Sequence, residues 1–252
     1  RLGGSLGRDA ATGRGCLNAT ERFLEHGICA GLESIAGLRI AVQGLGNVGS
    51  NAMRLFHEAG ARIICVSDSQ GGVADEEGLN PDEVLAHKAE SGTVVGLPET
   101  KTITNEDLLT CDCDILIPAA LECQILERNA ERVQAKLVVE AANAPVSPEA
   151  DEILEKRGVV VLPDIVANGG GVIVSYFEWV QNLENQQWPL DEVERKLKQK
   201  MEAAVDAIVA RWQHLRDNRD RGDGASPTLR DAALVEAIRR LSEVILQRDI
   251  WM

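Results

Sequence analysis

The chain has 252 residues, of which 44% are hydrophobic, enough to bury a substantial core in one large domain or two small ones. Its 26 basic and 40 acidic residues give a formal charge of -14, which argues against binding to nucleic acids or anionic membranes. No apolar run approaches the ~18 residues of a membrane-spanning helix, and no signal peptide is visible. We therefore expect a cytoplasmic protein.

The cysteines show neither a disulfide framework nor a C-x-x-C pair, and a chain of this size does not need disulfide bonds for stability. We interpret all six as buried thiols. A structural zinc site requires about four ligands at short paired spacings, and the histidines are scattered along the chain. No metal site is therefore expected. The six cysteines are Cys16, Cys29, Cys65, Cys111, Cys113 and Cys123.

A predicted helix over residues 9–26 comes first, and a connecting segment leads from it to a short apolar strand over residues 40–42. Glycines with G-x-G-x-x-G spacing follow this strand, and a predicted helix over residues 48–59 comes next. Gly44 can form the tight turn, Gly46 lets the backbone approach a pyrophosphate, and Gly49 lets the helix pack on the strand. The order of strand, glycines and helix indicates a phosphate-binding unit.

A second apolar strand, over residues 63–66, leads to Asp68, which follows the glycines by about twenty residues. An acidic side chain at that position meets the ribose hydroxyls of an adenosine in dinucleotide-binding units. The combination predicts dinucleotide binding, whereas the glycines alone are equally compatible with a structural turn.

Strands and helices continue to alternate in the rest of this region. Asn80 caps a predicted helix over residues 81–90, and the segment 104–107 opens a short helix in the same way. Short, continuously apolar strands that alternate with helices indicate a parallel sheet covered on both faces, in a doubly wound α/β arrangement. The further predicted strands are 114–118, 137–140 and 159–162, and the further predicted helices are 124–133 and 148–157.

The loops that follow these strands should form the ligand-binding edge of the sheet. Ala119 and Ala120 are small enough for a flat ring to lie against the backbone, and Asn143 and Asn168 each offer a donor and an acceptor. The alternative is that each asparagine only caps the following helix. Asp164 lies nearest to a possible base position, but we interpret it as a cap for the helix after Ala167.

Two long amphipathic helices are predicted in the last quarter of the chain. Apolar residues recur at threes and fours over 190–215, a polar stretch over 217–226 interrupts them, and Thr228 and Asp231 form a capping box before a last helix. The apolar stripe of this last helix contains Leu234, Ile238, Leu241 and Ile245. Such stripes usually face a core, and part of this one is expected to be bare or to contact another chain.

The chain resembles the cofactor-binding domain of the glutamate dehydrogenases in the Glu/Leu/Phe/Val dehydrogenase family. The matching segments run through the whole length in family order: G-R-D-A-A-T-G-R-G at 7–15, V-Q-G-L-G-N-V-G at 42–49, S-D-S-Q-G at 67–71, I-P-A-A at 117–120, E-A-A-N at 140–143, A-N-G-G-G-V-I-V-S-Y-F-E-W-V-Q-N at 167–182 and T-L-R-D-A-A at 228–233.

The resemblance implies a Rossmann-like fold that binds NAD, with NADP also possible, because Asp68 should repel a 2'-phosphate whereas Ser69 could donate to one. Thr12 and Asn47 would hold the nicotinamide carboxamide, and the two asparagines of the sheet edge would lie on the nicotinamide side. The implied cofactor-binding residues are Thr12, Gly44, Gly46, Asn47, Val48, Gly49, Asp68, Ser69, Ala119, Ala120, Asn143 and Asn168, and the implied substrate-binding residues are Arg8, Val172 and Ser175.

The implied reaction is the interconversion of L-glutamate with 2-oxoglutarate and ammonia, in a homo-oligomer that is a hexamer in the family. Family members carry a catalytic lysine and a catalytic aspartate in an upstream substrate domain, and neither motif is present in residues 1–252. We therefore expect one NAD(P)-binding domain whose helices over about 189–252 pack on it and toward that upstream domain, with no catalytic residue of its own. The alternatives are a leucine, valine or phenylalanine dehydrogenase, and a non-catalytic nucleotide-binding sensor.

Overall fold

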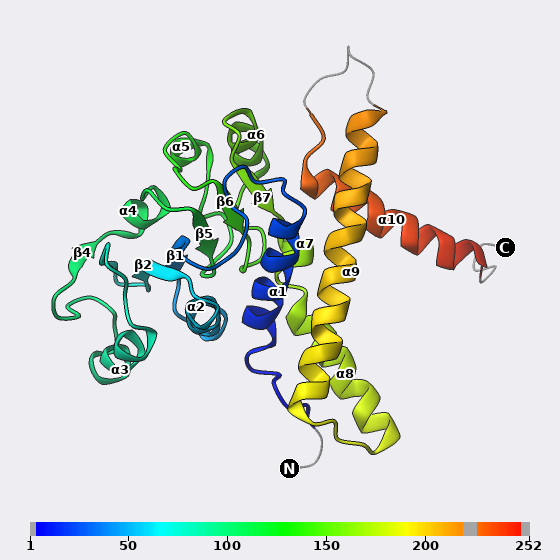
Figure 1. Cartoon of the computed structure of the whole chain (residues 1–252), viewed down its shortest axis with the longest axis horizontal. Coiled ribbons are helices and arrows are strands. Elements are labelled where there is room, and N and C mark those ends of the chain that lie inside the picture. Colours follow the sequence, from blue (N-terminus) through cyan, green and yellow to red (C-terminus); the bar gives the residue numbers. More distant parts are fainter. Residues whose placement is uncertain (1–3, 219–225, 248–252) are drawn as a thin grey trace.

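A computed structural model describes residues 4–218 and 226–247 and contains a seven-stranded sheet in the order β4-β3-β2-β1-β5-β6-β7 (Figure 1). The strands β2, β1, β5, β6 and β7 run parallel to one another, and β3 and β4 extend the sheet antiparallel at one edge. The strands are β1 (Arg39–Gln43), β2 (Arg62–Ser67), β3 (Gly72–Ala74), β4 (Lys101–Ile103), β5 (Ile115–Pro118), β6 (Leu137–Val139) and β7 (Val160–Leu162).

Helices cover both faces of this sheet. The ten helices of the described residues are α1 (Ala11–Glu25), α2 (Asn47–Glu58), α3 (Pro81–Ser91), α4 (Asn105–Leu109), α5 (Glu127–Ala130), α6 (Pro148–Lys156), α7 (Asp164–Ala167), α8 (Gly170–Glu184), α9 (Leu190–Asp217) and α10 (Leu229–Gln247).

The side chains of β1 show how the two faces are filled. Ile40 and Val42 pack into the core shared with α1, α2 and α9, whereas Ala41 packs into a second core shared with α4, α5 and α6. Because both faces of a central strand are buried, the strand is continuously apolar rather than alternating. The predicted doubly wound α/β architecture is therefore confirmed.

Two parts of the sheet region differ from the sequence-based expectations. The strands β3 and β4 were not predicted, because each is only three residues long and pairs only within an antiparallel extension of the edge. The helix predicted over 124–133 is wrong in its extent, since only Glu127–Ala130 is helical. The preceding segment is extended because Ile125 bridges to Val146 and its backbone N–H donates to the carbonyl of Pro145.

The helix caps are largely those predicted. Asn80 accepts a hydrogen bond from the backbone N–H of Asp82, and Thr104 forms a reciprocal capping box with Asp107. At the head of α10, the Thr228 hydroxyl accepts from the N–H of Asp231 while the Asp231 carboxylate accepts from the N–H of Thr228. These side chains satisfy N–H groups that have no partner within the helix.

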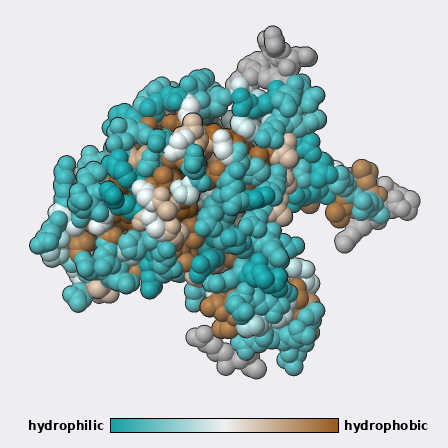
Figure 2. Space-filling model, in the orientation of Figure 1, coloured by the Kyte–Doolittle hydropathy of each residue, from teal (hydrophilic) through white to brown (hydrophobic). Residues whose placement is uncertain are grey.

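The two C-terminal helices bury very different amounts of apolar surface. Val193, Leu197 and Met201 of α9 are buried against the core, whereas α10 projects away from the sheet (Figures 1 and 2). Its exposed apolar side chains include Leu234, Ile238, Leu241 and Leu246. The expectation of a partly bare stripe is confirmed for α10, and most of the polar stretch predicted over 217–226 lies outside the described residues.

Four of the six cysteines are buried, as predicted, but Cys111 is only partly buried and Cys123 is exposed. Cys123 has a positive φ of 55° in the loop after β5, directly before the helix predicted over 124–133. None of the helices in the described parts of the chain is long and apolar enough to cross a membrane.

Candidate functional site

The turn between β1 and α2 requires glycine at two positions for reasons internal to the fold. Gly44 has a φ of +88°, and a Cβ atom on it would lie 2.7 Å from the Cβ atom of Ala120. A Cβ atom on Gly49 would overlap the carbonyl oxygen of Gly44. The positive φ of Gly44 favours glycine there. At position 49, α2 packs so closely on the strand that any side chain would overlap the backbone of Gly44.

Gly46 has no such internal reason to be glycine. Its φ is -77°, which any residue can adopt, and a Cβ atom on it would meet nothing within 4 Å. Gly46 is the N-cap of α2, and no side chain caps this helix. The space beside Gly46 therefore lies open next to backbone N–H groups and a positive helix end, which is the environment that a phosphate group requires.

A pocket of about 700 Å³ lies next to this turn, at the carboxyl ends of β5 and β6. This volume lies within the usual range for small-molecule sites. Nine residues proposed from the sequence line it: Arg8, Thr12, Val48, Ala119, Ala120, Asn143, Asn168, Val172 and Ser175. The sequence reasoning did not assign five others to the site, namely Leu121, Glu122, Ala141, Ala142 and Gly171.

Close packing of α1 against α8 brings two distant parts of the sequence together in this pocket. A Cβ atom on Gly15 would lie 2.7 Å from the Cα atom of Gly170, and a Cβ atom on Gly171 would lie 2.5 Å from the Thr12 hydroxyl. Glycine at these positions lets the two helix backbones approach closely. Thr12 and Arg8 consequently line the same pocket as Val172 of α8.

The side chains of the two asparagines in the pocket are hydrogen-bonded to each other, and neither caps the start of the following helix. The Asn168 side-chain N–H donates to the Asn143 side-chain oxygen over 2.7 Å. Ser147 caps α6, and Gly169 precedes α8 without a side-chain cap, so the helix-cap alternative is wrong for both asparagines. Asn168 also does not open α8, because it is the C-cap of the preceding short helix α7, which ends at Ala167.

Six proposed cofactor residues lie outside the pocket lining: the three glycines of the turn, and Asn47, Asp68 and Ser69. The Asn47 amide donates to the carbonyl of Asp9 over 2.8 Å and so joins the start of α2 to the start of α1. Ser69 is exposed in the loop after β2. The contacts predicted for these residues with a cofactor stay predictions.

Asp68 is 8% exposed as a residue, and its carboxylate binds its own chain. It accepts hydrogen bonds from the N–H of Val94 at 2.7 Å, the N–H of Gln70 at 2.8 Å and the Thr93 hydroxyl at 3.2 Å. Burial alone would raise the pKa of Asp68, but these hydrogen bonds and the nearby Lys88 outweigh burial and hold the pKa below its usual value. The carboxylate thus anchors the 93–95 loop to the end of β2.

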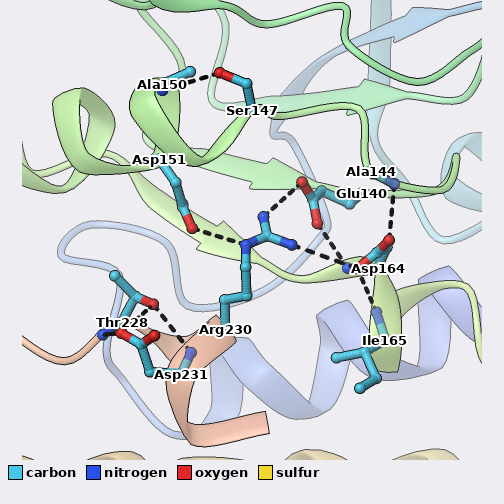
Figure 3. A network of polar contacts seen from close by, with 10 residues as sticks. All are labelled: Glu140, Ala144, Ser147, Ala150, Asp151, Asp164, Ile165, Thr228, Arg230 and Asp231. Carbon is cyan, nitrogen blue, oxygen red and sulfur yellow. Dashed lines mark hydrogen bonds and ion pairs between the residues drawn. The ribbon is translucent and has the colours of Figure 1, made fainter. Parts of the chain in front are cut away.

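Asp164 does not cap the helix after Ala167, contrary to the sequence-based interpretation. It is the first residue of α7, and its carboxylate accepts hydrogen bonds from the backbone N–H groups of Ala144 and Ile165, each at 2.8 Å (Figure 3). Its contacts therefore join the loop after β6 to α7.

Charged and hydroxyl groups line the pocket near α8. Within the described parts of the chain Arg8 forms no ion pair, so its guanidinium is available to an anion in the pocket. The Ser175 hydroxyl donates to the carbonyl of Gly171 over 3.0 Å, a contact with the backbone of its own helix. No described group of three or more His, Cys, Asp or Glu side chains could hold a metal ion.

The family model for Glutamate/Leucine/Phenylalanine/Valine dehydrogenase matches residues 3–248. The chain belongs to this family. A glutamate dehydrogenase of Thermotoga maritima is 45% identical over an alignment that covers 99% of the chain and 57% of that relative. The chain thus spans little more than half the length of the curated relative that it matches.

Solved structures of the family have the same fold. The hetero-hexameric glutamate dehydrogenase of Thermus thermophilus, in its Leu-bound form, is 35% identical with a TM-score of 0.86, over 98% of the chain and 55% of that protein. Glutamate dehydrogenase of Peptoniphilus asaccharolyticus is 31% identical with a TM-score of 0.80, over 99% of the chain and 56% of that protein.

Proposed function

We propose that the chain is the NAD(P)-binding domain of a glutamate dehydrogenase, which interconverts L-glutamate with 2-oxoglutarate and ammonia. The observation that carries the proposal is one continuous site, in which the glycine turn adjoins a pocket lined by paired asparagines and by residues of α1 and α8. Family membership and similarity to named glutamate dehydrogenases support the choice of reaction.

The described residues fit a nicotinamide dinucleotide. The open space at Gly46 and the start of α2 suit the pyrophosphate, and Ala119, Ala120 and Ala142 leave room for a flat ring. The Asn143–Asn168 pair offers polar groups to the nicotinamide side. When bound, the cofactor supplies the hydride acceptor for substrate oxidation.

We propose NAD as the cofactor, with NADP also accommodated. The Lys88 ammonium donates to the carbonyl of Leu45 in the glycine turn over 2.6 Å and lowers the pKa of Asp68 from nearby. A cation at this position would offset repulsion between the Asp68 carboxylate and a 2'-phosphate. Lys88 is therefore the basic group that makes NADP compatible with this site.

The substrate would lie between Arg8 and the start of α8. A carboxylate that leaves water needs a cation or hydrogen-bond donors facing it, and Arg8 offers both. Val172 would flank the aliphatic stem, and the Ser175 hydroxyl would donate to the side-chain carboxylate once its proton turns away from Gly171. The two residues are three positions apart and so lie on one helix face.

Proton transfer in this reaction needs a group that can both take up and release a proton near neutral pH. Among the described residues that line the pocket, Arg8 and Glu122 are the ionisable ones, and an arginine stays protonated. Because family members carry their catalytic lysine and aspartate in an upstream substrate domain, we assign proton transfer to such a domain rather than to Glu122, in a homo-oligomer that is a hexamer in the family. Residues 1–252 then form a single cofactor-binding domain that is inactive by itself.

A contrast between two glycines tests the proposal. Gly46→Val should abolish saturable NADH binding, measured by tryptophan fluorescence, because its side chain fills the phosphate space. The fold should lose only about 1 kcal/mol for a poorer N-cap, or about 2–4 °C in Tm. The matched control Gly49→Val should instead unfold the domain, since its side chain would overlap Gly44. Unaltered protein that fails to bind NADH at millimolar concentration would contradict the proposal.

A further inference from the structure

Arg230, near the start of α10, forms ion pairs with three carboxylates that come from three different elements. Its Nε atom lies 2.8 Å from Asp151 of α6, and its two terminal nitrogens lie 2.8 Å from Glu140 after β6 and 3.4 Å from Asp164 of α7 (Figure 3). Every nitrogen of the guanidinium thus has a different acceptor. Only the forked donor geometry of arginine can satisfy such an arrangement.

These carboxylates would repel one another without the guanidinium. Glu140 is completely buried, and Asp151 is 7% exposed. Burial raises the pKa of Glu140, and the hydrogen bond and charge of Arg230 act against that rise. A buried carboxylate that loses its only cation must become protonated or move toward water. Arg230 therefore determines whether the segment after β6 can keep its position.

That segment and α7 together carry the paired asparagines of the pocket. One oxygen of Glu140 accepts from Arg230, and the other accepts from the backbone N–H of Asp164 over 2.8 Å. Asp164 in turn accepts from the N–H of Ala144, the residue that follows Asn143. The network thus joins both loops, and neither Arg230 nor any of its three carboxylate partners lines the pocket.

We propose that Arg230 is a positioning residue that holds Asn143 and Asn168 where they can bind the nicotinamide half of the cofactor. This inference rests on the proposed function, because it requires that the pocket binds NAD(H). It links α10, none of whose described residues lines the pocket, to one half of the dinucleotide site. The adenosine half lies at the glycine turn and does not depend on this network.

Titration with two ligands distinguishes a positioning role of Arg230 from a general contribution to the stability of the fold. NADH reports on the whole site, whereas ADP carries only the adenosine and pyrophosphate. We expect Arg230→Lys and Arg230→Met to raise the Kd of NADH about tenfold and to leave the Kd of ADP within about twofold. The matched control Arg240→Met removes an ion pair to Glu236 on the same helix and should change neither Kd.

Arg230→Met combined with Glu140→Gln removes the guanidinium together with the charge of Glu140, the completely buried partner, so it tests the role even if the single Met variant folds poorly. The double variant should regain Tm but keep the weakened NADH binding. Equal weakening of NADH and ADP, or an unchanged NADH Kd in both the Lys variant and the double variant, would overturn the positioning role. Unaltered protein that binds ADP but not NADH would contradict the proposed function and the inference with it.

Discussion

Replacement of Asp68 by Asn tests whether this carboxylate anchors the 93–95 loop. The amide keeps one acceptor oxygen but places an N–H donor opposite the N–H of either Val94 or Gln70. Because Asp68 is buried, the unmatched donor finds little water. A hydrogen bond to a charged group contributes about 1.5–3 kcal/mol, so we expect the free energy of unfolding to fall by about that amount.

Thermal unfolding at pH 7 measures this loss directly. At about 2–4 °C per kcal/mol for a domain of this size, Asp68→Asn should lower Tm by about 3–12 °C. Asp75→Asn is the matched control, because Asp75 accepts one hydrogen bond from the N–H of Glu77 in an exposed turn. A change at such a surface position should stay within about 0.5 kcal/mol.

The pH dependence of the difference gives a second check. The lowered pKa of Asp68 means that its stabilisation is present above the usual aspartate pKa of about 3.9 and is lost as the pH falls through the lower folded-state value. The Tm gap between the parent and Asp68→Asn should therefore narrow below about pH 4. An unchanged Tm at pH 7 together with weaker NADH binding would refute the anchoring role and favour a direct contact with the ribose.

Two further predictions concern α10 and the substrate. Hydrogen bonds from Arg239, Arg240 and Arg211 lower the pKa of Glu236 to about 2. The stabilisation of the α9–α10 contact by this carboxylate should therefore disappear as the pH falls from about 4.5 to about 2, and the helical circular dichroism should decrease over that range. Glu236→Gln should show the decreased signal already at pH 7. Identical acid titrations of the two proteins would contradict this. Ser175→Ala should lower kcat/KM for glutamate about tenfold in an enzyme that contains the upstream domain, and retention of full activity would exclude the proposed contact.

The fold could be predicted from the sequence because its central strands satisfy one simple requirement. A strand such as Ile40–Val42 must be apolar on both faces when helices cover both, and the alternation of such strands with helices leaves few possible topologies. The edge strands β3 and β4 are short and carry no comparable pattern. The extended segment before α5 also could not be foreseen, since its pairing partner at Val146 is far along the chain.

The site was predictable where its residues follow strands and was not where tertiary contacts decide their role. Spacing correctly placed Asp68 at the end of β2, but the loop that its carboxylate binds comes 26 residues later. Likewise, the glycines at 170 and 171 could be identified in a motif, whereas their packing against Gly15 and Thr12 depends on how α1 crosses α8. Arg230 lay within a matching motif, but its three partners are 66 to 90 residues away.

The exposed face of α8 bears on what completes the pocket. Val172 lines the pocket and is 72% exposed, and Tyr176, Trp179 and Leu183 continue from it at spacings of four, three and four, each more than half exposed. These positions form a single helix face, and contiguous apolar surface of this kind marks an interaction site. The chain covers only 57% of its Thermotoga relative, and we propose that the upstream domain of the proposed function covers α8 beside Val172. Such a cover would bring its proton-transfer groups to the open side of the pocket and exclude water there.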